Sequence, residues 1–203
     1  MTSLCFATNN KNKLEEIRAQ LGSFFLIKNL EEIGCFEELP ETQNTIEGNS
    51  IQKAKYVFDR YKVPCFADDT GLEVDALHGE PGVYSARYAL LNGAVGRAGH
   101  QRSNEDNIQL VLAKLEGFKD RTARFRTIIT LAEADGITTF EGVVNGVILK
   151  EKRGTSGFGY DPVFLPEGCS KTFAEMSLTE KSLISHRAIA GKKLIKFVKA
   201  KYS

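Results

Sequence analysis

Short apolar runs and helical repeats alternate along the first third of the chain. Residues 4–8 and 24–28 are apolar runs of strand length, and residues 13–21 between them place apolar side chains every three or four positions. Each run therefore predicts a strand, and the repeat predicts a helix that connects them. A chain that opens with βα units is typical of α/β proteins.

A second helix and a third strand follow from the same reasoning. Residues 39–44 are a polar loop with one proline, after which Thr45 can cap a helix whose apolar positions recur on one face. Residues 65–67 are apolar and predict a strand that ends at Asp68 and Asp69. The two acids are therefore expected at the carboxyl end of a strand.

The middle of the chain is rich in glycine, and a hairpin follows it. Residues 78–103 predict mostly loop, with a short helix over 84–91, and Ser103 begins a helix with an apolar stripe. Residues 123–134 and 138–150 are β-rich and flank an Asp-Gly pair, which is a strong hairpin signal.

Two further segments complete the predicted architecture. Residues 151–162 form a glycine-rich loop, and residues 179–201 are mainly helical, in two pieces. Helices that alternate with strands early in the chain, followed by a long hairpin, predict an α/β fold with a mixed sheet.

Composition excludes several classes of protein. The 203 residues are 42% hydrophobic and 26% charged with a formal net charge of +1, a balance that gives no sign of a nucleic acid polymer or membrane as partner. No apolar run approaches the roughly 20 residues of a spanning helix, and the N-terminus does not resemble a signal peptide. Four widely spaced cysteines suggest neither a metal cluster nor a disulfide framework, so we expect a cytoplasmic protein.

Residues 8–13 are the first candidate site. The sequence Thr-Asn-Asn-Lys-Asn-Lys joins a predicted strand to a predicted helix, where backbone N–H groups and the helix dipole favour phosphate. A polar turn capped by asparagine explains the same residues, and in isolation that simpler interpretation is favoured. Neither a Walker A loop nor a G-x-G-x-x-G motif follows a strand.

Asp68 and Asp69 are the second candidate. Adjacent acids after an apolar strand are costly to bury unless they bind a cation or accept hydrogen bonds. Carboxylate oxygens suit Mg²⁺, whereas an Asx-type turn is the alternative explanation. Because successive strand side chains point to opposite faces, only one of the two acids can point straight into a cleft.

Two later segments offer further binding groups. In residues 154–162, three glycines allow close approach of the backbone to a ligand, and two aromatic rings offer flat surfaces for a base or sugar. Lys181 can neutralise phosphate, and His186 and Arg187 can donate hydrogen bonds to a planar acceptor. A plain loop and a structural histidine are the simpler interpretations.

Taken together, these segments resemble motifs of the inosine triphosphate pyrophosphatase family (XTP/dITP diphosphatases). Its opening pattern T-G-N-x-x-K corresponds to residues 8–13, and its acid segment corresponds to residues 67–72. Residues 81–88, 157–164 and 180–187 follow in the family's order. The resemblance covers nearly the whole chain.

This resemblance implies a fold and an activity. The fold would be a long mixed β-sheet flanked by helices, with residues 1–203 forming one domain of two lobes around a central cleft. The protein would be a homodimer. It would use Mg²⁺ to hydrolyse the non-standard purine nucleoside triphosphates ITP, dITP and XTP to the monophosphate and pyrophosphate, which cleanses the nucleotide pool.

The resemblance also implies roles by position. Asp69 would be the catalytic residue and would bind the metal with Glu41, and Asp68 would be an occasional ligand or lie behind them. Lys53 would face phosphate, and Thr70 would contact substrate. The implied substrate-binding residues are Thr8, Asn9, Asn10, Lys11, Asn12, Lys13, Lys53, Thr70, Phe158, Gly159, Tyr160, Asp161, Lys181, His186 and Arg187.

Three positions depart from the family pattern. Asn9 replaces the usual glycine, and asparagine tolerates a left-handed backbone better than most residues. Thr70 stands where serine is commoner and keeps the hydroxyl. Residues 47–50 read Glu-Gly-Asn-Ser instead of E-E-N-A, so an acid is missing at Gly48.

Base preference would follow from hydrogen-bond donors. His186 and Arg187 would pair with the 6-oxo group of hypoxanthine or xanthine and leave the 6-amino group of adenine facing donors. One rival is a diphosphatase for modified pyrimidine triphosphates, as in the septum-inhibitor-like family, but the segment 185–187 favours purine. A non-catalytic nucleotide sensor is the other rival, and the presence of both Glu41 and Asp69 argues against it.

Overall fold

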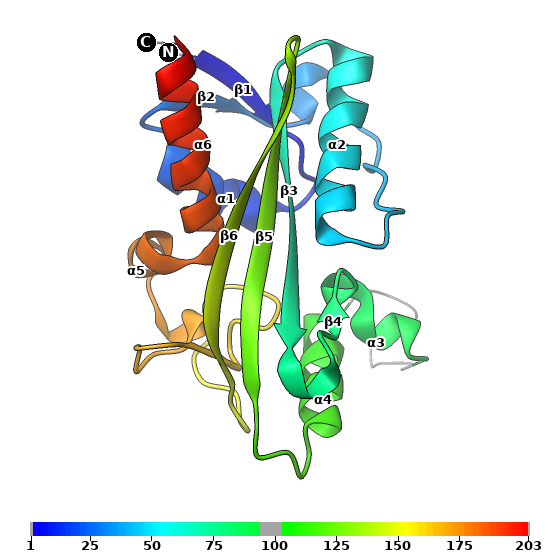
Figure 1. The fold of residues 1–203 in the computed structure, drawn as a ribbon, viewed down its shortest axis with the longest axis vertical. Helices are drawn as coiled ribbons and strands as arrows, with labels where there is room; N and C mark the ends of the chain where they lie inside the picture. The colour runs from blue at the N-terminus through cyan, green and yellow to red at the C-terminus, as the bar shows by residue number, and fades with distance from the viewer. Residues whose placement is uncertain (1, 94–102, 203) are drawn as a thin grey trace. The chain divides into compact units, whose positions relative to one another are not determined.

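The N-terminal βα units build three neighbouring strands. In the computed structural model, which describes residues 2–93 and 103–202, β1 (Thr2–Phe6) pairs in parallel with β2 (Phe25–Lys28) and with β3 (Cys65–Val74). Helix α1 (Lys11–Leu21) connects β1 to β2, and α2 (Ile46–Tyr61) precedes β3 (Figure 1). The three strands and two helices expected in this region are confirmed.

The chain divides into two compact units. Unit 1 comprises Met1–Asp69, Thr127–Val143 and Ser182–Ser203, and unit 2 comprises Thr70–Arg126 and Val144–Lys181. The sheet order is β2-β1-β3-β5-β6-β7, with β4 beside β3. The strands β3, β5 (Thr122–Glu133) and β6 (Gly136–Ile148) contribute residues to both units.

Unit 1 has a hydrophobic core on each face of its strands. One core combines Phe6 and Phe66, whose rings stack at 4.8 Å, with side chains of α1 and α6 (His186–Tyr202). The other combines Ala7 and Ala67 with side chains of α2. Because strand residues alternate between faces, α1 and α6 cover one face and α2 covers the other.

Unit 2 contains two short antiparallel strands and an aromatic core. The strand β4 (Pro81–Gly82) pairs with β3, and β7 (Phe164–Pro166) pairs with β6. Phe164 lies 4.7 Å from Phe125 and 5.4 Å from Phe173, measured between ring centroids.

The remaining helices of the described residues belong to both units. They are α3 (Tyr88–Leu91), α4 (Asn104–Lys114), α5 (Leu178–Ile184) and the 3₁₀ turns η1 (Glu31–Ile33), η2 (Asp75–Leu77), η3 (Ser85–Arg87) and η4 (Phe173–Glu175).

Parallel and antiparallel pairs in one sheet, with helices packed against its strands, confirm the predicted α/β class and mixed sheet. The two predicted pieces of the C-terminal helix are α5 and α6. Within the described residues, no helix is long and apolar enough to cross a membrane.

Three details of the sequence prediction were wrong or incomplete, and a fourth lies outside the described residues. The strand β3 does not end at Asp68 but continues to Val74, because both acids form ion pairs with lysines of the flanking helices. The predicted helix over 84–91 is split into η3 and α3. Part of the predicted loop, residues 94–102, lies outside the described residues. The strands β4 and β7 were not anticipated, since two or three residues are too few to show a period.

Candidate active site

Asp68 and Asp69 point to opposite faces of the sheet. The carboxylate of Asp68 forms ion pairs with Lys13 of α1 and Arg187 of α6, whereas that of Asp69 forms an ion pair with Lys53 of α2. This is the alternation expected of neighbouring residues in a strand. Two adjacent acids thus have separate environments, and each environment must be judged on its own.

The surroundings of Asp68 balance its charge. Asp68 is fully buried, with Oδ1 2.9 Å from Lys13 Nζ and Oδ2 2.9 Å from Arg187 Nε, and Arg187 also pairs with Glu16. Burial alone would raise the pKa of Asp68, but the charges of Lys13 and Arg187 outweigh it and hold that pKa below its usual range. Asp68 is therefore an ionised partner that links α1 and α6 to β3.

The surroundings of Asp69 leave it short of positive charge. Lys53 Nζ lies 3.4 Å from Asp69 Oδ1 and 2.6 Å from Glu41 Oε1, so two carboxylates share one ammonium group. Burial raises the pKa of Asp69, and the charges of Lys53 and Lys13 only partly oppose this. Conversely, Asp69 and Glu41 raise the pKa of Lys53 although burial lowers it. This arrangement suits a carboxylate that takes up a proton or a cation.

Glu41 and Asp69 are the two carboxylates whose chemistry fits the donor set of a magnesium ion. Among the described residues, no group of three or more His, Cys, Asp and Glu side chains is arranged to hold a metal. Mg²⁺ usually takes one or two carboxylates and completes its coordination with substrate phosphates and water. The two acids supply that number of hard oxygen donors, at a point where the ammonium of Lys53 shows that positive charge is favoured.

Residues 8–13 comprise the end of the connection from β1 and the first residues of α1. Asn10 is the N-cap of α1 and accepts a hydrogen bond from the backbone of Lys13 at 3.2 Å. The hydroxyl of Thr8 in turn accepts one from the backbone of Asn10 at 3.2 Å. The capping interpretation is thus confirmed, and it coexists with the phosphate hypothesis, because a capped helix N-terminus still presents backbone N–H groups.

The backbone of Asn9 is not left-handed. Among the described non-glycine residues, only Lys62 and His78 have positive φ. The explanation that asparagine replaces glycine here through tolerance of such a backbone is therefore wrong. Asn9 instead makes specific side-chain hydrogen bonds, which are treated below.

His186 is fixed at the start of α6. Its Nδ1 lies 2.6 Å from the hydroxyl of Thr127 in β5, and the imidazole is 3% exposed. Gly142 in β6 permits this close packing, since a Cβ there would stand 2.0 Å from the carbonyl oxygen of His186. Buried Arg187 follows directly and has its Nε and Nη1 engaged by Asp68 and Glu16. Base recognition by His186 and Arg187 stays a prediction.

In unit 2, the predicted residues of the glycine-rich loop form a second ion-pair site. Lys181 Nζ lies 2.6 Å from Asp161 Oδ2 and 5.1 Å from the ring centroid of Phe158. The same carboxylate oxygen accepts a hydrogen bond from the backbone of Phe158 at 2.8 Å. Tyr160 is buried and donates its hydroxyl hydrogen to the carbonyl of Ser85. Its ring is therefore part of the core of unit 2, and the open flat surface expected of it is not observed.

The predicted site residues divide between the two units. Unit 1 holds residues 8–13, Glu41, Lys53, Asp68, Asp69, His186 and Arg187; unit 2 holds Thr70, residues 158–161 and Lys181. In unit 1, ion pairs join Asp68 to Lys13 and Arg187, and Lys53 to Glu41 and Asp69. In unit 2, an ion pair joins Asp161 to Lys181. Sequence reasoning missed Glu16 and Thr127, the partners of Arg187 and His186. Only Glu16 carried a signal, as an acid one helical turn after Lys13.

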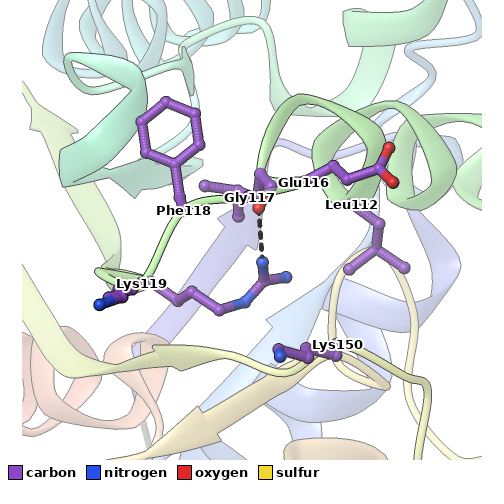
Figure 2. A pocket seen from close by; sticks show the side chains of 8 residues that line it. Leu112, Glu116, Gly117, Phe118, Lys119 and Lys150 are labelled. Atoms are coloured by element: carbon purple, nitrogen blue, oxygen red, sulfur yellow. Dashed lines mark hydrogen bonds between the residues drawn. The ribbon is translucent and has the colours of Figure 1, made fainter.

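A separate pocket in unit 2 contains none of these residues. It has a volume of about 570 Å³ and is lined by Leu112, Leu115, Glu116, Gly117, Phe118, Lys119, Arg121 and Lys150 (Figure 2). The guanidinium of Arg121 donates to the carbonyls of Leu115, Ile148 and Leu149 at 2.7 to 3.0 Å. Arg121 therefore ties the end of α4 to the end of β6, which is a structural role.

Fold and site together define an α/β protein in which buried carboxylates of one strand pair with lysines of the flanking helices. The sequence profile of the Ham1 family matches residues 4–197. This chain belongs to the Ham1 family.

Known proteins resemble the chain over almost its full length. It is 51% identical to the dITP/XTP pyrophosphatase of Flavobacterium johnsoniae, over 97% of this chain and 98% of the relative, and 43% identical to that of Bacillus subtilis, over 98% of each. The Staphylococcus aureus Ham1 protein superposes with a TM-score of 0.85 at 35% identity, over 98% of this chain and 100% of that one. These similarities confirm the resemblance drawn from the motifs.

Proposed function

We propose that this protein is a dITP/XTP pyrophosphatase that hydrolyses dITP, XTP and ITP to the nucleoside monophosphate and pyrophosphate with Mg²⁺. The observation that carries the proposal is the pair Glu41 and Asp69, held on a single ammonium of Lys53. Family membership and the names of the relatives support the substrate class. The homodimer remains an expectation from the resemblance, and the cytoplasmic location remains an expectation from the cysteine pattern.

In this reaction, water attacks the α-phosphorus, and the bond from that phosphorus to the oxygen shared with the β-phosphate breaks. Glu41 and Asp69 would hold Mg²⁺, which would supply neutralisation of the phosphate charge when bound. Asp69 would orient the attacking water and accept its proton. Without a bound cation, burial raises the pKa of Asp69, so a cation beside it would favour the ionised carboxylate.

Lysine side chains would carry the rest of the charge. Lys13 and Lys53 form ion pairs with carboxylates, so their ammonium groups are held beside the acids. When a cation binds Glu41 and Asp69, Lys53 would leave a carboxylate and pair with phosphate instead. Lys181, held by Asp161 in unit 2, is the third candidate for phosphate.

The direct test is pyrophosphate release from a panel of triphosphates in the presence of Mg²⁺. We expect release from dITP, XTP and ITP well above that from ATP, GTP and modified pyrimidine triphosphates. Binding of dITP without any release would indicate a nucleotide sensor instead. The matched negative control is Asp69→Asn, which keeps the size of the side chain and removes its charge.

A further inference from the structure

The side chain of Asn9 contacts the segment that leads to Glu41. Its Nδ2 donates to the carbonyl oxygen of Glu37 at 3.4 Å, and its Oδ1 accepts from the backbone N–H of Leu39 at 3.3 Å. A carboxamide used in this way imitates a peptide group of a neighbouring strand, which pairs with alternate residues. A glycine at this position could make neither contact.

The far side of the same segment is held by α2. The side-chain amide of Gln52 accepts from the backbone of Thr42 at 2.9 Å and donates to its hydroxyl at 2.8 Å. Buried Asn49 accepts from the backbone of Gln43 at 2.9 Å. Glu41 therefore lies between two sets of contacts, with Asn9 before it and α2 after it.

Glu37, whose backbone Asn9 contacts, is itself held by side chains of α2. Its carboxylate accepts hydrogen bonds from Tyr61 at 2.7 Å and Tyr56 at 3.0 Å, and it pairs with Arg60 at 3.2 Å. The hydroxyl of Tyr61 contributes most to lowering the pKa of Glu37 to about 2, so this anchor stays charged at neutral pH. The segment that Asn9 contacts is thus attached to the C-terminal turns of α2.

We infer that Asn9 is a positioning residue for Glu41: through residues 37–39 it holds the segment in the conformation that brings Glu41 to Lys53 and Asp69. This inference rests on the proposed function in one respect, namely that Glu41 and Asp69 hold a divalent cation. It assigns Asn9 a task that differs from contact with the triphosphate, the role implied for it by its place in residues 8–13.

The first experiment measures the contact itself. Hydrogen exchange of the Leu39 amide, followed by NMR on the full-length protein, should quicken about fivefold in Asn9→Ala, the effect of losing one hydrogen bond of about 1 kcal/mol. Asn9→Asp keeps the acceptor and should retain the protection of Leu39. An unchanged exchange rate in Asn9→Ala overturns the inference.

The second experiment measures its consequence without any nucleotide. Binding of Mn²⁺ alone, measured by electron paramagnetic resonance, should weaken about fivefold in Asn9→Ala and Asn9→Gly, in proportion to the lost contact. Asn29→Ala is the matched control, because Asn29 also organises a loop, through hydrogen bonds with its neighbour Glu32. Its Mn²⁺ affinity should equal that of the wild type.

The outcomes separate this inference from the proposed function. Faster exchange at Leu39 with unchanged Mn²⁺ affinity would show that the contact is merely structural and overturns the positioning role. An equal loss of affinity in Asn29→Ala does the same. If the wild type binds Mn²⁺ but releases no pyrophosphate from dITP, the proposed function fails while the role of Asn9 is still decided by these two measurements.

Discussion

The two faces of β3 give two neighbouring aspartates different electrostatic environments, with opposite effects on their pKa values. Asp68 is fully buried against Lys13 and Arg187, and its pKa is lowered. Asp69 shares Lys53 with a second carboxylate, and its pKa is raised. The same side chain is therefore a structural counterion where cations are sufficient, and under the proposed function it is the reactive group where they are not.

Replacing Asp69 should have the largest effect on activity. We expect Asp69→Asn to lower the rate of pyrophosphate release from dITP by about three orders of magnitude, because it removes a general base and a metal ligand together. Urea unfolding should show a stability equal to or above that of the wild type, since an under-neutralised buried charge disappears. A normal rate would contradict the role given to Asp69.

Replacing Asp68 should mainly affect stability. Asp68→Asn leaves two buried cations without their shared carboxylate, and we expect a loss of about 3 to 5 kcal/mol in the free energy of unfolding. Urea denaturation measures it. If instead Asp68→Asn unfolds like the wild type and loses all activity, the contrast between the two faces is wrong.

Arg187 can show whether its guanidinium does more than balance charge. Arg187→Lys keeps a cation for Asp68 but loses the planar donor group that also reaches Glu16, so we expect a stability loss of about 1 to 2 kcal/mol. The ratio of ITP to ATP turnover in this variant tests base recognition. A fall in that ratio supports direct readout, and an unchanged ratio leaves Arg187 as a counterion only.

The thiols on the Asp69 face should be inert. Burial contributes most to raising the pKa of Cys5 to about 12, whereas Cys169 is partly exposed. Iodoacetamide at pH 8 should therefore modify Cys169 first and leave Cys5 unmodified, as measured by mass spectrometry. Because the unfolded thiol ionises near pH 9 and the folded one does not, Cys5 should favour the folded state less as pH rises above 9. Rapid modification of Cys5 would indicate that this face opens readily.

Several parts of the fold could be predicted because their signals are local. The strand and helix periods of residues 4–28, the Thr45 cap and the two-piece C-terminal helix all depend on side chains a few positions apart. The end of β3 could not be predicted in this way. In the sequence, two adjacent acids indicate the end of a strand. The lysines and the arginine that form ion pairs with them are distant in the sequence and come close only on folding.

The sequence by itself determined the family, the α/β class and the identity of the acids, because the order of motifs and the hydrophobic period can be read along the chain. Only the tertiary structure decided what each acid does. Lys13, Lys53 and Arg187 are 55, 16 and 119 residues from their aspartates. Coulomb interactions and burial act through space, so the difference between Asp68 and Asp69 exists only once the helices pack on opposite faces of the strand.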